Sequence, residues 1–115
     1  MTVSDCLFCK IIRKEIPSNF LYETDQVIVI RDINPKAKVH ILVIPKQHVV
    51  TFNDITTATS SVMADLGLAI AQVTKNLGIA DSGYKVVANN GRDGGQLVPH
   101  LHLHVLGGES VRGVT

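Results

Sequence analysis

The sequence contains no tryptophan, few aromatic residues and only two cysteines, and it lacks any long apolar run. Its apolar runs are short, as at residues 41–44, whereas a membrane-spanning helix needs roughly 20 residues, so we expect no membrane segment. Residues 1–10 show no basic segment followed by an apolar stretch, so we expect no secretory signal and a cytoplasmic protein. In that reducing compartment, Cys6 and Cys9 are expected to be thiols or metal ligands rather than a structural disulfide.

A basic run is also missing. The 11 basic and 10 acidic side chains leave a formal charge of +1, which argues against the binding of long nucleic acid. A small anionic ligand is compatible with this balance, because a few backbone amides and imidazoles can hold a phosphate. The 115 residues contain no internal repeat or low-complexity segment, and 45% of them are hydrophobic, so residues 1–115 are predicted to form one globular domain.

The apolar periodicity predicts an α+β domain. Residues 6–13 have helical spacing and precede Pro17, which indicates a short helix. A 3.6-residue repeat over 55–77, with Asn53 or Asp54 as the N-cap and Gly78 after its end, predicts one long helix. Strands are predicted at 20–24, 27–32, 39–44 (closed by Pro45), 84–89 and 101–106. Short connections favour an antiparallel sheet with the helices gathered on one side.

Three of the five histidines alternate near the end of the chain, at His100, His102 and His104. Because side chains of a strand alternate between its faces, these three are expected on one face, about 6.5 Å apart. The apolar residues between them are expected to face the core. The pKa of imidazole suits metal, nucleophilic and acid–base roles. Two chemistries remain open at this point: a catalytic zinc held by histidines, or an imidazole nucleophile whose neighbours hold a phosphate.

The loop before these histidines, residues 89–96, is rich in glycine. Gly91, Gly94 and Gly95 allow successive backbone N–H groups to turn toward an anion. The loop lacks the Lys-Ser/Thr ending of a P-loop and does not open a Rossmann helix. Its position directly before three aligned histidines favours a phosphate-bearing substrate.

The segment His-Leu-His-Leu-His-Val-Leu at 100–106 resembles the signature of the histidine triad (HIT) family. Asp-Gly-Gly-Gln at 93–96 and Gly-Gly at 107–108 resemble its Hint branch, the nucleoside phosphoramidate hydrolases. Segments 11–17, 31–35 and 40–46 agree as well, so the resemblance extends over residues 6–108. It implies a HIT-like α+β fold: an antiparallel five-stranded sheet with one long and one short N-terminal helix. It also implies a homodimer with a continuous sheet.

The resemblance also implies roles for single residues. His102 would be the nucleophile toward a purine nucleotide, with His104, His40 and the Gly95–Gln96 region stabilising charge or moving protons, and no cofactor needed for catalysis. Asp32 would accept hydrogen bonds from the ribose hydroxyls, and Asn89 would lie near the phosphate. His100 is assigned to the nucleotide site as well. The apolar walls of the base pocket would be Phe8, Ile11, Ile16, Ile30 and Ile33.

The spacing Cys6-x-x-Cys9 is typical of zinc ligands, and such a site needs two more of them. In similar bacterial proteins, histidines at the positions of His48 and His100 complete the set. The resemblance therefore implies a closed Cys₂His₂ zinc site with a structural role. Because four protein ligands leave no open position, this zinc would not be catalytic.

Leu97 departs from the family pattern, since several members carry serine or threonine there, and the tail after Gly108 lacks an aromatic residue found in some relatives. Three functions are therefore weighed. The first is cleavage of the P–N bond of adenosine or guanosine 5′-phosphoramidates. The second is hydrolysis of dinucleoside polyphosphates, and the third is a nucleotide-binding regulatory module with little catalysis. A metallo-hydrolase using all three histidines ranks last.

Overall fold

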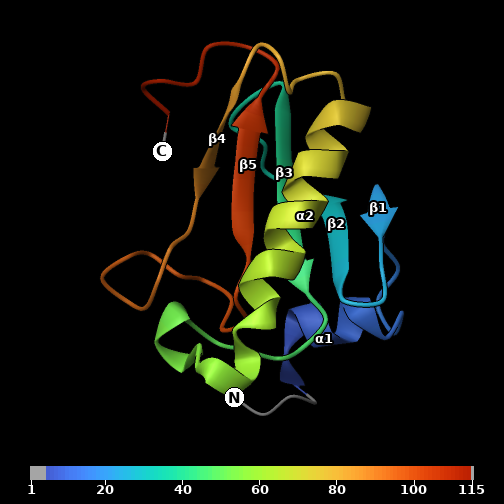
Figure 1. Cartoon of the computed structure of the whole chain (residues 1–115), viewed down its shortest axis with the longest axis vertical. Coiled ribbons are helices and arrows are strands. Elements are labelled where there is room, and N and C mark those ends of the chain that lie inside the picture. The colour runs from blue at the N-terminus through green and yellow to red at the C-terminus, as the bar shows by residue number, and fades with distance from the viewer. Residues whose placement is uncertain (1–4, 115) are drawn as a thin grey trace.

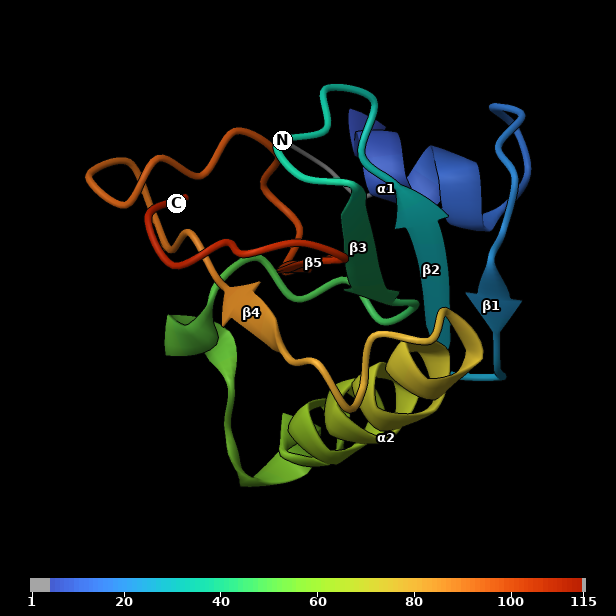
Figure 2. The ribbon, with the colours of Figure 1, turned by 90° about the horizontal axis from the view of Figure 1, so that it is seen from above.

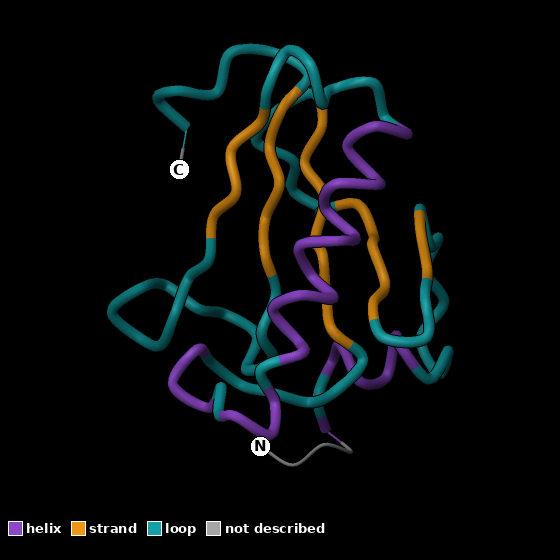
Figure 3. The backbone as a smooth tube through the Cα atoms, in the orientation of Figure 1, coloured by secondary structure: helices purple, strands orange, loops and turns teal. Residues whose placement is uncertain are grey.

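The computed structural model describes residues 5–114, which form one five-stranded antiparallel sheet with two helices (Figures 1 and 3). The strands are β1 (Tyr22–Glu23), β2 (Val27–Arg31), β3 (Val39–Pro45), β4 (Tyr84–Val87) and β5 (Leu103–Gly107), in the spatial order β1-β2-β3-β5-β4. Helix α1 (Leu7–Ile12) precedes them, and α2 (Ser61–Asn76) lies between β3 and β4. The predicted α+β class is confirmed. Within the described residues, no helix is long and apolar enough to cross a membrane.

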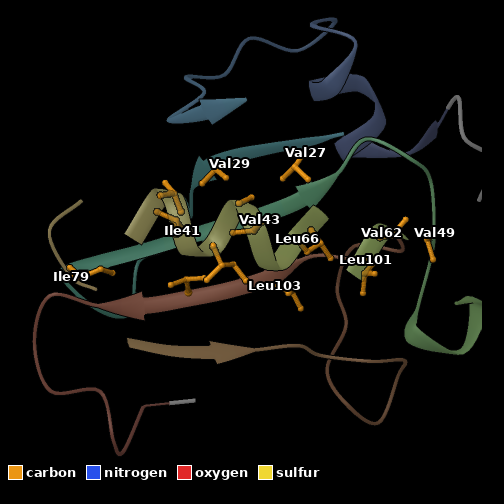
Figure 4. Packing of buried hydrophobic residues seen from close by; sticks show 14 residues of the cluster. Val27, Val29, Ile41, Val43, Val49, Val62, Leu66, Ile79, Leu101 and Leu103 are labelled. Atoms are coloured by element: carbon orange, nitrogen blue, oxygen red, sulfur yellow. The ribbon is translucent and has the colours of Figure 1, made fainter. Parts of the chain in front are cut away.

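The two helices cover opposite faces of the sheet (Figure 2). One face of β2 and β3 packs against α2, and its buried side chains are Val27, Val29, Ile41 and Val43 (Figure 4). The other face packs against α1 through Ile28, Ile30, Leu42 and Ile44. The prediction that both helices lie on one side is therefore wrong. Because β2 and β3 are apolar on both faces, each face needs its own cover.

Helix α2 begins at Ser61 rather than near residue 55, and the predicted caps Asn53 and Asp54 do not start it. Two short 3₁₀ helices, Phe52–Asp54 and Thr57–Thr59, occupy the preceding segment. The Thr59 hydroxyl accepts the Thr56 N–H at 2.7 Å, and such side-chain bonds compete with a continuing α-helix. The other end is confirmed, because Gly78 follows α2 with a φ of 72°.

Strand β5 begins two residues later than predicted, at Leu103. The Leu101 N–H donates to the Val49 carbonyl at 2.6 Å, so the segment before β5 is bonded to the chain that follows β3 rather than to the sheet ladder. Of the three alternating histidines, only His104 lies in the strand. At the end of β3, Pro45 still belongs to the strand, opposite Val27.

Candidate active site and adjoining metal centre

His40 on β3 and His104 on β5 form a close pair. In the antiparallel register, Leu42 lies opposite His104 and Leu106 opposite His40, so the two histidines are diagonal neighbours on one face. Nε2 of His40 is 3.0 Å from Nδ1 of His104. The sheet therefore brings together two predicted catalytic residues that are 64 positions apart in the chain.

Asp32 joins this pair from the end of β2. Its Oδ2 lies 3.4 Å from Nε2 of His40 and 3.8 Å from Nδ1 of His104. Its Oδ1 accepts the Asn34 N–H at 2.8 Å, which fixes the carboxylate at the start of the loop. The carboxylate of the predicted ribose-binding residue thus lies beside the ring nitrogens of two histidines.

The backbone N–H of Lys36 determines the tautomer of His40. It donates to Nδ1 of His40 at 3.1 Å, so the neutral ring carries its proton on Nε2 and can donate that proton to Nδ1 of His104. Asp32, His40 and His104 lie close enough to share a metal ion. A metal at His40 Nε2, however, would require a proton on Nδ1, where it would oppose the Lys36 N–H. This cluster suits proton handling better than metal binding.

His102 is almost fully buried and has a defined tautomer. Its Nδ1 lies 2.8 Å from the carbonyl oxygen of His100 and must donate there, so Nε2 keeps its lone pair. Its ring centroid lies 5.0 Å from that of Phe8 and 5.1 Å from that of His104. This is the arrangement an imidazole nucleophile needs.

Burial keeps these rings uncharged near neutral pH. It lowers the pKa of His104 to about 4, with His102 and His40 adding to the effect. It also lowers the pKa of His102 and of His40, in both cases against the attraction of Asp32. The pKa of His100 falls to about 4, again mainly through burial. Neutral rings can pass protons and attack an electrophile without first losing a charge.

The second cluster consists of Cys6, Cys9, His48 and His100, whose four ligand atoms all lie within 4.8 Å of one another. Sγ of Cys6 is 3.3 Å from Nδ1 of His100, and Sγ of Cys9 is 3.2 Å from Nδ1 of His48. The two Nδ1 atoms are 3.2 Å apart. Helix α1 and two distant loops thus converge at one point, with Cys6 and His100 separated by 94 positions.

These distances fit a tetrahedral metal ion. Zinc with bonds of about 2.3 Å to sulfur and 2.0–2.1 Å to nitrogen places neighbouring ligand atoms roughly 3.3–3.8 Å apart. Nε2 of His100 donates to the Pro45 carbonyl at 2.8 Å, which leaves Nδ1 as the ligand atom. The Cys9 N–H also donates to Sγ of Cys6 at 3.4 Å. The four side chains could therefore hold a metal ion, and all four were predicted as its ligands.

The glycine-rich loop is closed by its own hydrogen bonds. The N–H groups of Gly95 and Gln96 donate to the Arg92 and Gly91 carbonyls. The Gln96 side-chain amide donates to the Val50 and Val98 carbonyls, and its oxygen accepts the Gly91 N–H. Gly95 and Gln96 therefore brace the loop in this conformation. To contact a phosphate as predicted, the N–H groups of Gly95 and Gln96 must either share their hydrogen atoms with the phosphate or break these bonds to the loop. Asn89, another predicted contact, donates its side-chain amide to the Gly94 carbonyl at 2.8 Å.

The predicted apolar walls separate into two groups. Phe8 and Ile11 of α1 are buried together with Ile30 of β2, and Ile16 packs against that cluster. Ile33 is 92% exposed in the loop after β2. Of these five residues, Ile33 has the most exposed side chain.

Two hollows of the described surface have no histidine in their lining. One of about 880 Å³ is enclosed by residues 78–85 and 108–112, beyond the far end of β5. A second, of about 420 Å³, borders Ile11 and Ile16 on the outer side of α1. The chemistry of the histidine cluster therefore identifies the candidate site better than the depth of the surface does.

Three backbone groups orient the histidine rings and are not predicted from the sequence. They are the Lys36 N–H, the Pro45 carbonyl and the His100 carbonyl. Every residue carries such groups, so no sequence pattern marks the few that matter. Only their positions in the fold reveal them.

The HIT domain family matches residues 13–111, which include His40, His48 and the three alternating histidines. The chain belongs to the HIT family. Cys6 and Cys9 precede the matched segment. The candidate metal cluster of this HIT protein therefore combines two histidines from inside the matched segment with two cysteines from outside it.

Relatives of this HIT protein include enzymes and a metalloprotein. It is 41% identical to a purine nucleoside phosphoramidase of Escherichia coli, over 90% of this chain and 87% of the relative. A HIT family hydrolase from Clostridium thermocellum superposes with a TM-score of 0.91 at 45% identity, over 95% of each chain. A zinc-bound histidine triad protein from Mycobacterium smegmatis superposes with a TM-score of 0.78 at 32% identity, over 99% of this chain and 82% of that one.

Proposed function

We propose that this protein hydrolyses the P–N bond of purine nucleoside 5′-phosphoramidates through a nucleotidyl adduct on His102. The observation that carries the proposal is the 2.8 Å contact of His102 Nδ1 with the His100 carbonyl, which leaves Nε2 available for attack. The similarity to a purine nucleoside phosphoramidase supports the choice of bond and base.

The reaction has two steps. First, Nε2 of His102 forms a bond to the α-phosphorus while the P–N bond breaks, and the amine leaves with one added proton. Water then displaces the imidazole from phosphorus, which releases the nucleoside monophosphate and one proton. Neither step requires a cofactor. His104 would transfer the proton through Nε2, because its Nδ1 is engaged with His40.

The remaining predicted residues would bind the nucleotide. Asp32 would accept hydrogen bonds from the ribose hydroxyls, and the exposed Ile33 would contact the base. Phe8, Ile11, Ile16 and Ile30 would support that surface from below. Asn89, Gly95 and Gln96 would shape the loop around the phosphate, and His100 would hold His102 through its carbonyl.

Incubation with adenosine 5′-phosphoramidate tests this function. We expect release of AMP, and a rate lowered by roughly 10³- to 10⁶-fold in His102→Ala. Quenching in an alkaline denaturant should trap one adenylyl group on the peptide that contains His102, because a phosphorus–imidazole bond is labile in acid and persists in base. Leu68→Ala, an exposed change on α2, should keep the wild-type rate. Equal turnover by wild type and His102→Ala would exclude His102 as the nucleophile. Turnover of a dinucleoside polyphosphate alone would replace the proposed substrate.

A nucleotide-binding role with little catalysis is the second candidate, and Leu97 favours it. Its side chain is 93% exposed and carries no donor at a position where several family members have a hydroxyl. In that case, calorimetry should detect AMP binding by a protein that turns over the phosphoramidate slowly. Leu97→Ser should then raise the rate by roughly 100- to 1,000-fold, since one well-placed donor is worth about that much. An unchanged rate would remove Leu97 as the cause.

We also propose that Cys6, Cys9, His48 and His100 bind a structural zinc ion. The fit of their distances to a tetrahedral ion and the zinc-bound relative support this choice of metal. When bound, the ion would cross-link α1 to the loops that carry the two histidines.

Elemental analysis of protein purified without added metal should find about one zinc per chain. Cys6→Ser should contain none, whereas Leu7→Ala, an exposed change on the same helix, should keep it. A metal-free wild type would contradict the zinc assignment.

A further inference from the structure

His100 belongs to two sites at once. Its ring nitrogen Nδ1 lies 3.3 Å from Sγ of Cys6 in the metal cluster, while its backbone carbonyl oxygen lies 2.8 Å from Nδ1 of His102. The ring is held at its other nitrogen by the Pro45 carbonyl, 2.8 Å away. The same residue thus connects the metal ligands to the hydrogen bond that sets the tautomer of the proposed nucleophile.

Phe8 provides a second connection. It lies on α1 between Cys6 and Cys9, and its side chain is buried. The ring is nearly perpendicular to that of His102, at an interplanar angle of 83°, and also to that of His100, at 79°. Any movement of the two cysteines would therefore move the ring that packs against His102.

Helix α1 has only six residues, too few to be stable without tertiary contacts. Its buried residues pack under the sheet, and its two cysteines are the groups through which a metal could fasten it. The position of Phe8 therefore depends on how firmly α1 is attached.

The backbone around the other histidine ligand supplies a third connection. His48 is followed by Val49, whose carbonyl accepts the Leu101 N–H at 2.6 Å. The next carbonyl, that of Val50, accepts the Gln96 side-chain amide at 2.7 Å. The segments carrying His48 and His100 are thus bonded together directly beside the metal cluster, and the second of them continues into His102.

We propose that an occupied metal centre positions His102 for reaction, through the His100 carbonyl and the Phe8 ring, so that metal occupancy controls turnover. This proposal rests on the proposed function of His102. In it, the metal contacts neither substrate nor nucleophile, and Phe8 is a positioning residue rather than a wall of the base pocket.

Reversible metal removal tests the proposal on one polypeptide. Long-range ¹H–¹⁵N spectra of the histidine rings should show one Nδ1–H tautomer for His102 in zinc-loaded protein, and a mixture after chelation. The kcat for adenosine 5′-phosphoramidate should fall roughly 10- to 100-fold on chelation and return when zinc is restored, because small misplacements of a reacting group have effects of that size. An unchanged tautomer with unchanged kcat in folded, metal-free protein would overturn the proposal.

Phe8→Leu separates positioning from nucleotide binding. We expect it to retain zinc, to show mixed His102 tautomers and to lower kcat while leaving KM near the wild-type value. Leu7→Ala, the adjacent exposed position on α1, should change neither parameter. A raised KM with normal kcat and a single His102 tautomer would indicate that Phe8 forms part of the base pocket, and it would contradict the positioning role.

The two proposals fail in different ways. If the His102 tautomer responds to zinc but neither the zinc-loaded nor the zinc-free protein cleaves the phosphoramidate, the result supports the link between the metal and His102 and contradicts the proposed function. If both proteins cleave the phosphoramidate equally well and His102 has the same tautomer in each, the result supports the proposed function and contradicts the link between the metal and His102.

Discussion

The histidines differ in their backbone partners more than in their place in the sequence. The His100 ring donates to the Pro45 carbonyl, the His102 ring donates to the His100 carbonyl, and the His40 ring accepts the Lys36 N–H. Each contact assigns the ring proton to one nitrogen and leaves the other for a different task. In the proposed function, these contacts would suit His100 to bind a metal, His102 to act as the nucleophile and His40 to relay protons.

His104 should make stability depend on pH. Its folded-state pKa of about 4 lies below the usual 6.5, so between these values the unfolded chain binds a proton that the folded ring does not. Stability should therefore fall as pH drops from 6.5 to about 4, by about 2–3 kcal/mol from this residue. Urea denaturation across that window should show a smaller loss in His104→Gln. Equal losses in the two proteins would contradict the assigned pKa.

At the scale of elements, the pattern of β2 and β3 determines the layers. Both strands are buried on both faces, with Val27 and Val43 toward α2 and Ile28 and Ile44 toward α1. The layer under α1 contains the Cys₂His₂ cluster and the histidine pair, whereas the layer under α2 is mainly apolar, and the buried Thr74 hydroxyl of that helix donates to the Ile70 carbonyl. The site therefore lies on one face of a sheet whose other face provides most of the hydrophobic core.

Helix α2 should contribute stability through one face only. Leu66 is fully buried against the sheet, whereas Leu68 on the same helix is 71% exposed. Leu66→Ala should lower the free energy of unfolding by about 2–5 kcal/mol, and Leu68→Ala by less than about 0.5 kcal/mol. Urea denaturation of both variants measures the difference. Similar losses would show that the packing of α2 is not the one described.

At the scale of the whole molecule, the sheet has two edges, β1 and β4. Strand β1 spans only two residues, whereas β4 spans four and exposes Tyr84 and Val86. An exposed apolar edge favours pairing with another strand. The homodimer predicted from the family resemblance would therefore join two sheets through β4.

Light scattering after size exclusion should give the mass of a dimer, and Val86→Lys should shift it toward the monomer, because a charge on an exposed edge opposes pairing. Leu7→Lys, on α1, should leave the mass unchanged. A monomeric wild type would end the dimer proposal, and a dimeric Val86→Lys would place the interface elsewhere.

Local chemistry explains which predictions from sequence are confirmed. The β-branched run in 27–31, the helical repeat predicted over 55–77 and the glycine after α2 are local signals, so the elements largely follow from them. The start of α2 is less well predicted, because Thr56 and Thr59 offer the backbone alternative hydrogen bonds. The grouping of two cysteines with two histidines was predicted through the family resemblance, and the structure brings those four side chains together.

The order of the α-helices and strands can thus be predicted from the amino-acid sequence, as can the histidines and cysteines that are available for chemistry. Three features emerge only when the chain is folded: the helices cover opposite faces of the sheet, His40 pairs with His104, and the His100 carbonyl connects the Cys₂His₂ cluster to His102. The reason is that these contacts join residues far apart in the chain, up to 94 positions for Cys6 and His100. Periodicity describes which way a side chain faces, whereas the partner it meets depends on how the whole sheet is assembled.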